Sequence, residues 1–388
     1  MSKSEKQPAH LTRRSWMVLA ASAVTAGCGG GGPASMAGLP GTGGTGLFAQ
    51  GAIAGFGSVI INAIKFDDTL ATVLLDGQSA ASADLRLGMV ASIQGQRGSD
   101  ATLGIANRIE VWSIAQGLVS SGRAAPGSSG QFTLAGMTVL TDLNTIFEGN
   151  SATTPVLPGQ RLAVWGLQAG ADARTWSATR VATVSATAVV STGLVSVVNS
   201  QRSVNGLLLT GDAARALALG DLVRVNGILS TADGSLALQS VQYPSGPATS
   251  AQQGEAEIEG WVTSVAATNR FSLGGALVDA SQATFDPVSA PVAVGSRVEV
   301  SGVWQGGVLK ATKVQVQNVQ ELETVEISGR IQEFTSLANF VVRGQPCDAS
   351  ALSVVRNGKL TDLKLGASVK LTGTKAGDVL KVIQIDLI

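Results

Sequence analysis

Side chains that carry out chemistry are scarce in this sequence. Its 388 residues include one histidine, His10, and two cysteines, Cys28 and Cys347. His10 lies in an N-terminal segment that we expect to be removed on export, so the mature chain has no imidazole. This excludes Ser-His-Asp triads, histidine general bases and imidazole metal ligands. We therefore predict a protein that is not an enzyme and holds no metal and no cofactor.

Carboxylates are the remaining candidates for acid–base chemistry. Asp67 and Asp68 are adjacent in an expected turn, and neighbouring residues of a strand point to opposite faces. Two alternating sets would each share one strand face: Glu255, Glu257 and Glu259, and Glu321 and Glu323. Paired carboxylates can hydrolyse glycosides or bind calcium, so a carboxylate-dependent hydrolase of envelope polysaccharide stays an alternative. We favour the simpler interpretation that these acids keep an exposed strand edge soluble.

Tryptophan is the other residue type with a possible binding role. Trp165 and Trp304 lie beside the second glycine of a repeated motif, and Trp261 follows the first glycine of the fourth unit described below. Small barrels can bind oligosaccharides across one face, where an indole ring stacks on the ligand. A carbohydrate-binding module with Trp165, Trp261 and Trp304 as ligand-binding residues is therefore a second alternative. Packing at barrel rims is the competing interpretation.

The N-terminus has the order of an export signal. Basic residues (Lys3, Lys6, Arg13 and Arg14) precede an apolar stretch, Trp16–Ala26, that is too short to span a bilayer. Ala26-Gly27-Cys28 resembles the lipobox of bacterial lipoproteins, with Thr25 where leucine is usual, and residues 12–17 resemble a twin-arginine signal. We predict cleavage after residue 27 and lipid attachment at Cys28. Twin-arginine and general secretory export both stay open.

Charge and polarity limit the partners of the exported chain. Loss of residues 1–27 removes four basic residues and one acidic residue, leaving 23 against 26, which disfavours nucleic acid. Residues 181–201 lack charge but contain many Ser and Thr, so we predict two strands rather than a membrane span. The expected partners are the membrane, through the N-terminal lipid, and an envelope polysaccharide or protein. The predicted location is the cell envelope, at the outer rather than the inner membrane.

Three further features have structural interpretations. Gly41–Gly46 matches the spacing G-x-G-x-x-G of dinucleotide sites, but that fingerprint needs a strand before it and a helix after it, so we predict a flexible tether over residues 28–50. No cation adjoins Cys347, which we interpret as a buried apolar filler. The lysines of the last unit are expected on a solvated strand face: Lys359, Lys364, Lys370, Lys375 and Lys381.

One motif recurs five times. Two glycines seven residues apart enclose alternating apolar residues, as in Leu219-Gly220-Asp-Leu-Val223-Arg-Val225-Asn-Gly227. The first glycines are Gly88, Gly159, Gly220, Gly295 and Gly366, at intervals of 71, 61, 75 and 71 residues. The matching second glycines are Gly95, Gly166, Gly227, Gly302 and Gly373. We expect a positive φ at the first glycine and a bulge or sharp bend at the second.

Each copy has similar neighbours. A Gly-x-Val or Gly-x-Ile strand start precedes it, at Gly57, Gly117, Gly193, Gly260 and Gly329, and a closing strand such as Val314-Gln-Val316 follows. In the fourth copy the expected strands are 257–265, 270–273, 276–280, 297–304 and 308–316. The predicted fold is all-β, with five tandem small antiparallel β-barrel (OB-like) units of about 60–75 residues. The units are expected at 51–113, 114–186, 187–245, 257–318 and 319–388, with a linker at 246–256.

The Gly-x-Val start, the Leu-Gly-x-x-Val-x-Val-x-Gly element and the strand Ala311-Thr312-Lys313-Val314 resemble the bacterial domain-of-unknown-function 5666 (DUF5666) family. The resemblance covers nearly all of residues 51–388 and is most specific in the third to fifth units. Ala91 replaces the expected valine in the first unit, and the second has a longer segment between Val119 and Gly159. The resemblance implies a tandem, often lipid-anchored protein but no activity. We therefore predict a lipid-anchored, non-catalytic binding or spacer module.

Overall fold

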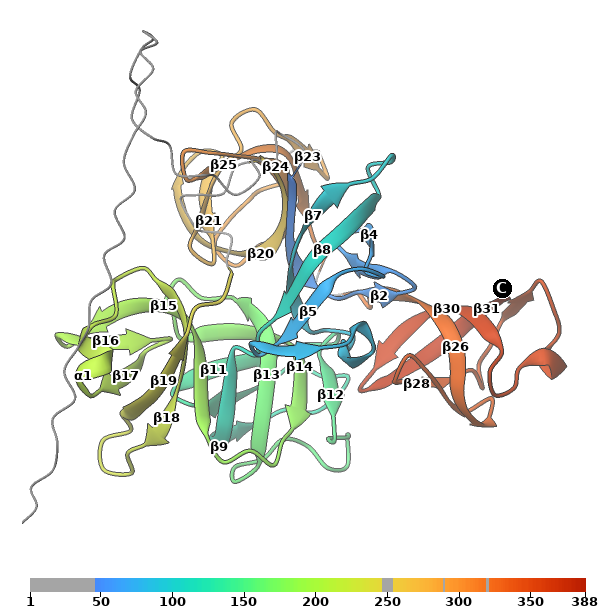
Figure 1. The fold of residues 1–388 in the computed structure, drawn as a ribbon, viewed down its shortest axis with the longest axis horizontal. Helices are drawn as coiled ribbons and strands as arrows, with labels where there is room; N and C mark the ends of the chain where they lie inside the picture. The colour runs from blue at the N-terminus through green and yellow to red at the C-terminus, as the bar shows by residue number, and fades with distance from the viewer. Residues whose placement is uncertain (1–45, 246–253, 289, 319–320) are drawn as a thin grey trace, which may run out of the picture. The chain divides into compact units, whose positions relative to one another are not determined.

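The protein is an all-β molecule. The computed structural model describes residues 46–245, 254–288, 290–318 and 321–388 (Figure 1). Strands dominate these residues, which contain one α-helical turn, α1 (Asp212–Arg215), and two 3₁₀ turns at Ser82–Asp84 and Leu360–Asp362. Among the described residues, no helix has the length and apolar character needed to cross a membrane. The two strands expected within 181–201 are confirmed, since one strand ends at Thr183 and the next spans Val189–Val198.

The strands fall into five successive groups along the chain. Residues 46–111 contain β1 (Gly46–Ala52), β2 (Gly55–Phe56), β3 (Val59–Ile61), β4 (Ile64–Asp67), β5 (Thr72–Leu75), β6 (Gln78–Ala80), β7 (Val90–Arg97) and β8 (Leu103–Val111). Residues 115–183 contain β9 (Ala115–Arg123), β10 (Gly130–Leu134), β11 (Met137–Thr141), β12 (Ile146–Glu148), β13 (Arg161–Gln168) and β14 (Thr175–Thr183). Residues 189–242 contain β15 (Val189–Val198), β16 (Gln201–Val204), β17 (Leu207–Thr210), β18 (Leu222–Leu229) and β19 (Leu236–Gln242).

The C-terminal half repeats this order. Residues 254–316 contain β20 (Gly254–Ala267), β21 (Arg270–Leu273), β22 (Ala276–Asp279), β23 (Thr284–Asp286), β24 (Arg297–Gln305) and β25 (Val308–Val316). Residues 324–387 contain β26 (Thr324–Ser336), β27 (Asn339–Val342), β28 (Gln345–Asp348), β29 (Val354–Arg356), β30 (Ser368–Ala376) and β31 (Val379–Leu387). The bounds in 254–316 lie close to those expected from the sequence. Only the short strand β23 was not expected.

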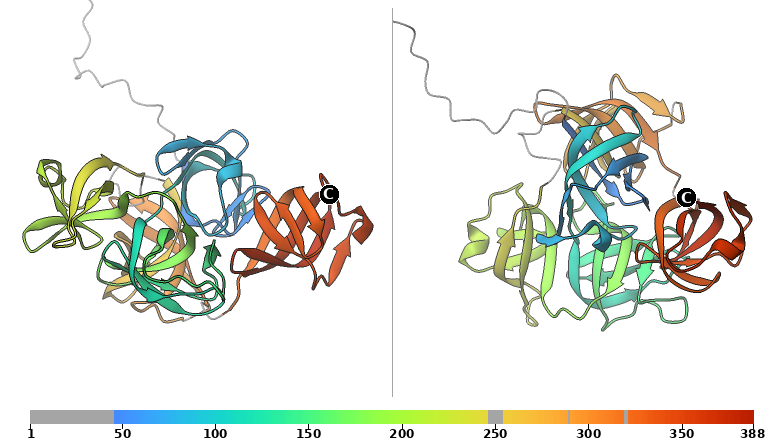
Figure 2. Two further views of the ribbon diagram at one scale, coloured as in Figure 1. Left: turned by 90° about the horizontal axis from the view of Figure 1, so that it is seen from below. Right: turned by 45° about the vertical axis from the view of Figure 1, so that its right-hand side comes forward.

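Five strands close a small barrel in residues 254–316. β20 pairs antiparallel with β21 and β24, β21 with β22, and β24 with β25, while β22 and β25 close the ring in parallel (Figure 1). The predicted antiparallel barrel is corrected in this detail. A ring of five strands cannot alternate direction throughout, so at least one neighbouring pair must be parallel. The same order closes the ring in 324–387, where β28 and β31 are the parallel pair (Figure 2).

The rings in 115–183 and 189–242 follow the same order, and their parallel pairs are β11–β14 and β17–β19. In residues 46–111 the first strand is interrupted between β1 and β2, and β4–β8 is the parallel pair. The strands form two sheets. β1 pairs with β20 and β2 pairs with β26, which joins three rings in a 20-stranded sheet, and β9–β15 joins the other two in an 11-stranded sheet.

The glycine motif does what the sequence predicts. All five first glycines have a positive φ, between +76° at Gly88 and +91° at Gly159. Four of them donate their amide to the carbonyl of a residue in the first strand of their ring, as Gly295 N does to Val262 O at 2.9 Å, and Gly88 N donates to Ile53 O between β1 and β2. At all five second glycines the register shifts by a β-bulge, as between Ser301 and Gly302. Both conformational predictions are confirmed.

Three expected boundaries are corrected. Gly88 N donates to Ile53 O, so Gly51-Ala52-Ile53, and not Gly57-Ser58-Val59, is the Gly-x-Ile start of the first ring. Residues 46–50 of the expected tether belong to β1, and residues 254–256 of the expected linker belong to β20. In both places a backbone ladder forms, because Leu47–Gln50 pairs with Glu255–Ile258. The last glycine of the G-x-G-x-x-G match, Gly46, thus begins a strand and not a helix.

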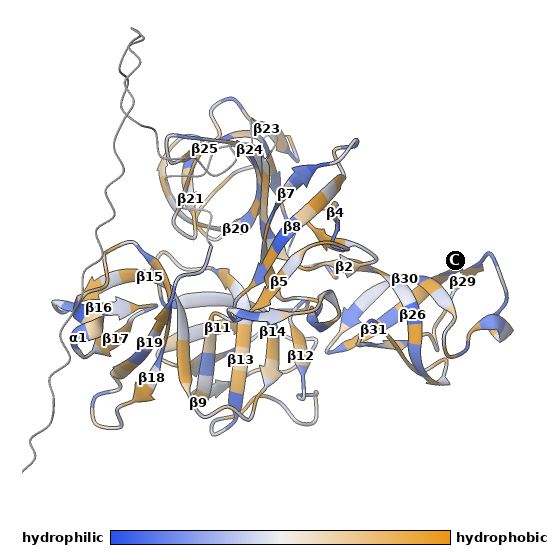
Figure 3. Ribbon diagram, viewed as in Figure 1, coloured by the Kyte–Doolittle hydropathy of each residue, from blue (hydrophilic) through white to orange (hydrophobic). Residues whose placement is uncertain are grey.

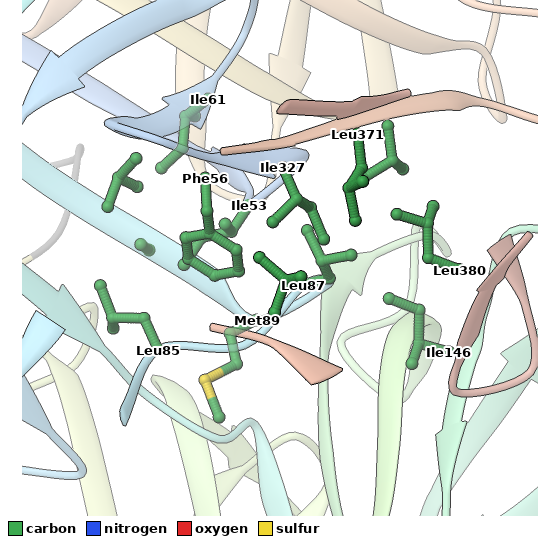
Figure 4. Packing of buried hydrophobic residues seen from close by; sticks show 14 of the residues in the cluster. Ile53, Phe56, Ile61, Leu85, Leu87, Met89, Ile146, Ile327, Leu371 and Leu380 are labelled. Atoms are coloured by element: carbon green, nitrogen blue, oxygen red, sulfur yellow. The ribbon is translucent and has the colours of Figure 1, made fainter. Parts of the chain in front are cut away.

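Alternating burial builds the cores. β30 shows the pattern most clearly, with every second residue buried, and Figure 3 shows hydrophobic and hydrophilic positions following one another along strands such as β8. One apolar cluster combines residues of 46–111 and 324–387 with a few residues of 115–183, among them Ile146, and Figure 4 shows Phe56 and Leu87 close to Ile327. Separate cores for each ring, which tandem independent units would have, are therefore not observed for these two segments.

Candidate functional site

The alternating glutamates of β20 lie in ion pairs. Arg97 of β7 reaches two of them, with Nε 2.6 Å from Glu255 Oε2 and Nη2 2.7 Å from Glu257 Oε1. Ser301 Oγ donates to the other oxygen of Glu257 at 2.6 Å. The parallel pairing of β1 with β20 brings these residues together, although more than 150 positions separate them in the sequence. These ion pairs connect β20 with β7, the strand on the other side of β1, so the glutamates do more than keep an edge soluble.

Glu259 belongs to a buried ion-pair network with Arg297, Glu323 and Lys375. The guanidinium of Arg297, 7% exposed, contacts Glu259, and its Nη1 lies 3.0 Å from Glu323 Oε1. Lys375 Nζ lies 3.0 Å from Glu323 Oε2. Burial alone would raise the pKa of Glu323, but the two cations outweigh it and lower the pKa. Two positive and two negative groups make this Arg297 network neutral overall.

Backbone groups tie further segments to the Arg297 network. The amide of Ala52, at the end of β1, donates to Glu259 Oε2 at 2.9 Å. The Asn144 side chain accepts from the amide of Glu323 at 2.9 Å and donates to the carbonyl of Glu321 at 2.8 Å. The network thereby joins residues of 46–111, 115–183, 254–316 and 324–387. Lys375 is 8% exposed, so the expectation that all the C-terminal lysines lie on a solvated face is wrong for this residue.

Glu299, next to the Arg297 network, has the electrostatics of a general acid. It lies directly opposite Glu259 in the β20–β24 ladder. Burial, and then the neighbouring charge of Glu259, raise the pKa of Glu299 to about 7. A glycosidase needs such an acid facing a second carboxylate across a cleft that admits substrate. Neither Glu299 nor Glu259 lines the four cavities compared among the described residues, which lie beside Arg202, Lys375, Leu140 and Trp112.

The remaining acidic candidates have local roles. Asp67 accepts hydrogen bonds from the amide and the hydroxyl of Thr69, at 3.0 and 2.6 Å, which fixes the turn after β4. The hydroxyl of Thr69, then its amide, lower the pKa of Asp67. Asp68 lies 3.7 Å from Arg343. Among the described residues no group of three or more His, Cys, Asp or Glu has a geometry that could hold a metal ion.

Two of the three tryptophans predicted to bind ligand are buried. Trp165 is 6% exposed and Trp304 3%, so neither presents a ring face on which a sugar could stack. Trp304 follows the alternating burial of β24, whereas Trp165 lies in β13, where six consecutive residues are buried. The indole N–H groups of both find no acceptor among the described residues. The predicted stacking role is therefore corrected for Trp165 and Trp304. The Trp304 ring fills the core of its own barrel, and the Trp165 ring packs in the apolar cluster that contains residues of 46–111 and 324–387.

Trp261 is the predicted residue that remains available. It lies in β20, is half-buried, and lines a cavity of about 420 Å³. Most of the cavity wall comes from residues 115–183: Ser129, Leu140, Thr141, Asp142, Leu143, Ala169 and Ser177, with Gly295 beside the tryptophan. The sequence indicates a turn at Asp142, whose Oδ1 accepts the amide of Asn144 at 2.9 Å. No sequence signal places that turn against Trp261.

Cys347 is a buried residue of β28. Cys347 is 1% exposed, and burial raises the pKa of its thiol to about 12, which agrees with an apolar filler and not with a reactive thiol. Its Sγ donates to the carbonyl of Gln345 at 3.2 Å. Cys28, the predicted site of lipid attachment, and the predicted signal peptide lie outside the described residues.

The comparison with protein families matches two of these segments. The family model described as Domain of unknown function (DUF5666) matches residues 116–182 and 259–315. These two segments are similar to DUF5666 domains. Their matches coincide with the barrels of 115–183 and 254–316, and each includes the glycine pair and the parallel closing strands. A search of curated proteins found no match to the chain.

The DUF5666 matches revise one detail of the sequence analysis. The second copy of the motif, interpreted as degenerate because of its long segment between Val119 and Gly159, is one of the two that match. Six residues separate β9 from β10, where two separate β20 from β21, and twelve separate β12 from β13, where ten separate β23 from β24. The extra residues are thus spread over connections between strands. Length between strands is therefore tolerated, whereas Gly159 and Gly166 keep the conformations of the motif.

Proposed function

We propose that this chain is a lipid-anchored protein of the cell envelope in which five tandem DUF5666-like barrels form a non-catalytic spacer and binding module. The observation that carries this proposal is the Arg297 network. It uses the carboxylates of Glu259 and Glu323, which the sequence offers as catalytic candidates, to connect segments far apart in the chain. A spacer needs connected units, because unconnected barrels on linkers would move independently of one another.

The five-unit organisation is supported by the recurrence of the glycine pair and of its hydrogen bond. In each copy two backbone hydrogen bonds join the turn at the first glycine to one residue near the start of the ring. In the last copy Gly366 N donates to Ile331 O at 2.8 Å, and Ile331 N donates to Ala367 O at 2.9 Å. A repeated supersecondary unit gains stability from its neighbours in tandem arrays. The sheet pairings β1–β20 and β2–β26 supply such contacts.

The anchoring part of the proposal is tested by Cys28→Ser. Since the lipid is the proposed membrane attachment, the variant should move from the detergent phase to the aqueous phase in Triton X-114 partitioning. Cys347→Ala is the matched control, because it removes the other cysteine and leaves the anchor, so it should stay in the detergent phase. Retention of the Cys28→Ser protein in the detergent phase would refute lipid anchoring at this residue.

The alternative from the enzyme class, a hydrolase of envelope polysaccharide, rests on Glu299. It predicts release of reducing ends from an envelope polysaccharide fraction, with loss of that activity in Glu299→Gln. The spacer proposal predicts no release by either protein. A release that depends on Glu299 would replace the spacer with the hydrolase.

A further inference from the structure

The cavity beside Trp261 has the composition of a small-molecule site. Its volume of about 420 Å³ falls within the range of such sites, roughly 300–1,000 Å³. Its lining includes the indole of Trp261 and the apolar side chains of Leu140 and Leu143, together with the polar side chains of Thr141, Asp142 and Ser177. A ligand that fits such a lining has an apolar face for the ring and hydrogen-bonding groups along its edge.

Two polar groups in the wall have unused hydrogen-bonding capacity. Asp142 Oδ1 accepts from the amide of Asn144 and the hydroxyl of Thr145, but Oδ2 accepts from none of the described residues. The hydroxyl of Thr141 is buried and has no partner among those residues. An unpaired buried hydroxyl is unfavourable, and a rotation of the Thr141 side chain towards the cavity would pair it with a ligand.

The charge of the wall selects among ligand classes. The side chains that line the cavity include one carboxylate, Asp142, and no lysine or arginine. Two cations, Arg297 and Lys375, line a smaller cavity that shares Asp142 and Trp261 with this one, and both are already paired with glutamates of the Arg297 network. A phosphate or another anionic group would therefore meet a negative oxygen and no free cation, whereas the hydroxyl of a neutral sugar can donate to Asp142 Oδ2.

We propose that the cavity beside Trp261 binds a short neutral saccharide. A pyranose ring stacks its C–H face on Trp261, and its hydroxyls donate to Asp142 Oδ2 and exchange a hydrogen bond with Thr141. Residues of 115–183 supply the polar contacts and β20 supplies the platform. The site therefore exists only while these two segments are held together.

The test uses isothermal titration calorimetry of the full chain in detergent, with maltohexaose, cellohexaose and chitohexaose as probes up to millimolar concentration. At least one probe should bind with a stoichiometry of one. Trp261→Ala should weaken that binding at least tenfold. Trp112→Ala is the matched control, since Trp112 is also half-buried but lies outside this cavity, and it should leave the affinity unchanged.

Thr141→Val separates a binding role from a structural one. The hydroxyl has no partner among the described residues, so its removal should leave the unfolding temperature unchanged or raise it, while saccharide affinity falls about tenfold. The proposal is overturned if no probe binds the wild-type chain, or if Trp261→Ala binds as well as the wild type. It is overturned equally if Thr141→Val keeps full affinity. None of these results bears on lipid anchoring, which the Cys28→Ser experiment tests separately.

Discussion

Replacing Gly302 with alanine should open the barrel of residues 254–316 at its bulge. An added Cβ would lie 2.3 Å from the carbonyl oxygen of Lys310 and 2.9 Å from Ala311 Cα, both backbone atoms of the paired strand β25. Real Cβ atoms essentially never come within 3.0 Å of such atoms, so β24 and β25 must separate locally. Loss of two or three ladder hydrogen bonds together with backbone strain predicts a destabilisation of about 3 kcal/mol or more.

Gly306 provides the matched control in the same hairpin. Its φ is +57°, but no atom lies within 4 Å of an added Cβ. Gly306→Ala should therefore lower the free energy of unfolding by only about 1 kcal/mol, the strain of a left-handed backbone conformation. Hydrogen exchange measured by mass spectrometry resolves the two variants, because it reports each segment separately where a single unfolding temperature would not. Protection in 254–316 should fall much further in Gly302→Ala. Equal protection in the two variants would refute the role given to the second glycine.

Three further predictions concern single residues. Glu299→Gln should remove part of the pH dependence of stability. In the folded chain the pKa of Glu299, about 7, lies above the ordinary value of 4.5, so the protonated carboxyl group adds about 3 kcal/mol of stability below pH 4.5. This contribution is lost as the pH rises through 7. Urea unfolding at pH 4 and pH 8 measures the difference, and an unchanged pH dependence in the variant would contradict it. Cys347 should resist Ellman's reagent at pH 8 until the chain is unfolded, and rapid labelling of the folded chain would show that its thiol is accessible. Gly373→Val, whose Cβ would lie 2.2 Å from Lys381 O, should lower exchange protection in 324–387 and also in 46–111, because the two segments share one apolar cluster; damage confined to 324–387 would indicate separate cores.

Features set by short-range rules were predictable from the sequence. The positive φ of Gly295 and the bulge at Gly302 follow from what a missing Cβ permits, and the strands of 254–316 follow from apolar residues that alternate between glycine-rich turns. The need for a parallel pair was also implicit in five strands closing a ring. The shift from Gly57 to Gly51 at the first strand was missed because both are followed, two residues later, by a β-branched apolar residue.

Features set by contacts between distant segments were not predictable. The alternation of Glu255, Glu257 and Glu259 indicated one shared face. Arg97, in β7, reaches two of these glutamates only because β1 pairs with β20 as well as with β7. The cavity beside Trp261 could not be predicted for the same reason. Position in the sequence does not distinguish Trp261 from the buried Trp165 and Trp304. It also does not distinguish the turn at Asp142 from other turns, because Trp261 and this turn come together only through the packing of two barrels.

The proposal that the barrels form one connected spacer is tested most directly by an electron paramagnetic resonance distance between them. Spin labels at Ser121→Cys in β9 and Ala266→Cys in β20 occupy exposed positions in two different barrels, and the buried Cys347 should not react with the label. The wild-type chain should give a single narrow distance distribution, and Arg297→Met, which leaves Glu259 and Glu323 without their shared cation, should broaden it. A broad distribution in the wild-type chain, or a distribution that Arg297→Met leaves unchanged, would contradict a spacer held together by these ion pairs.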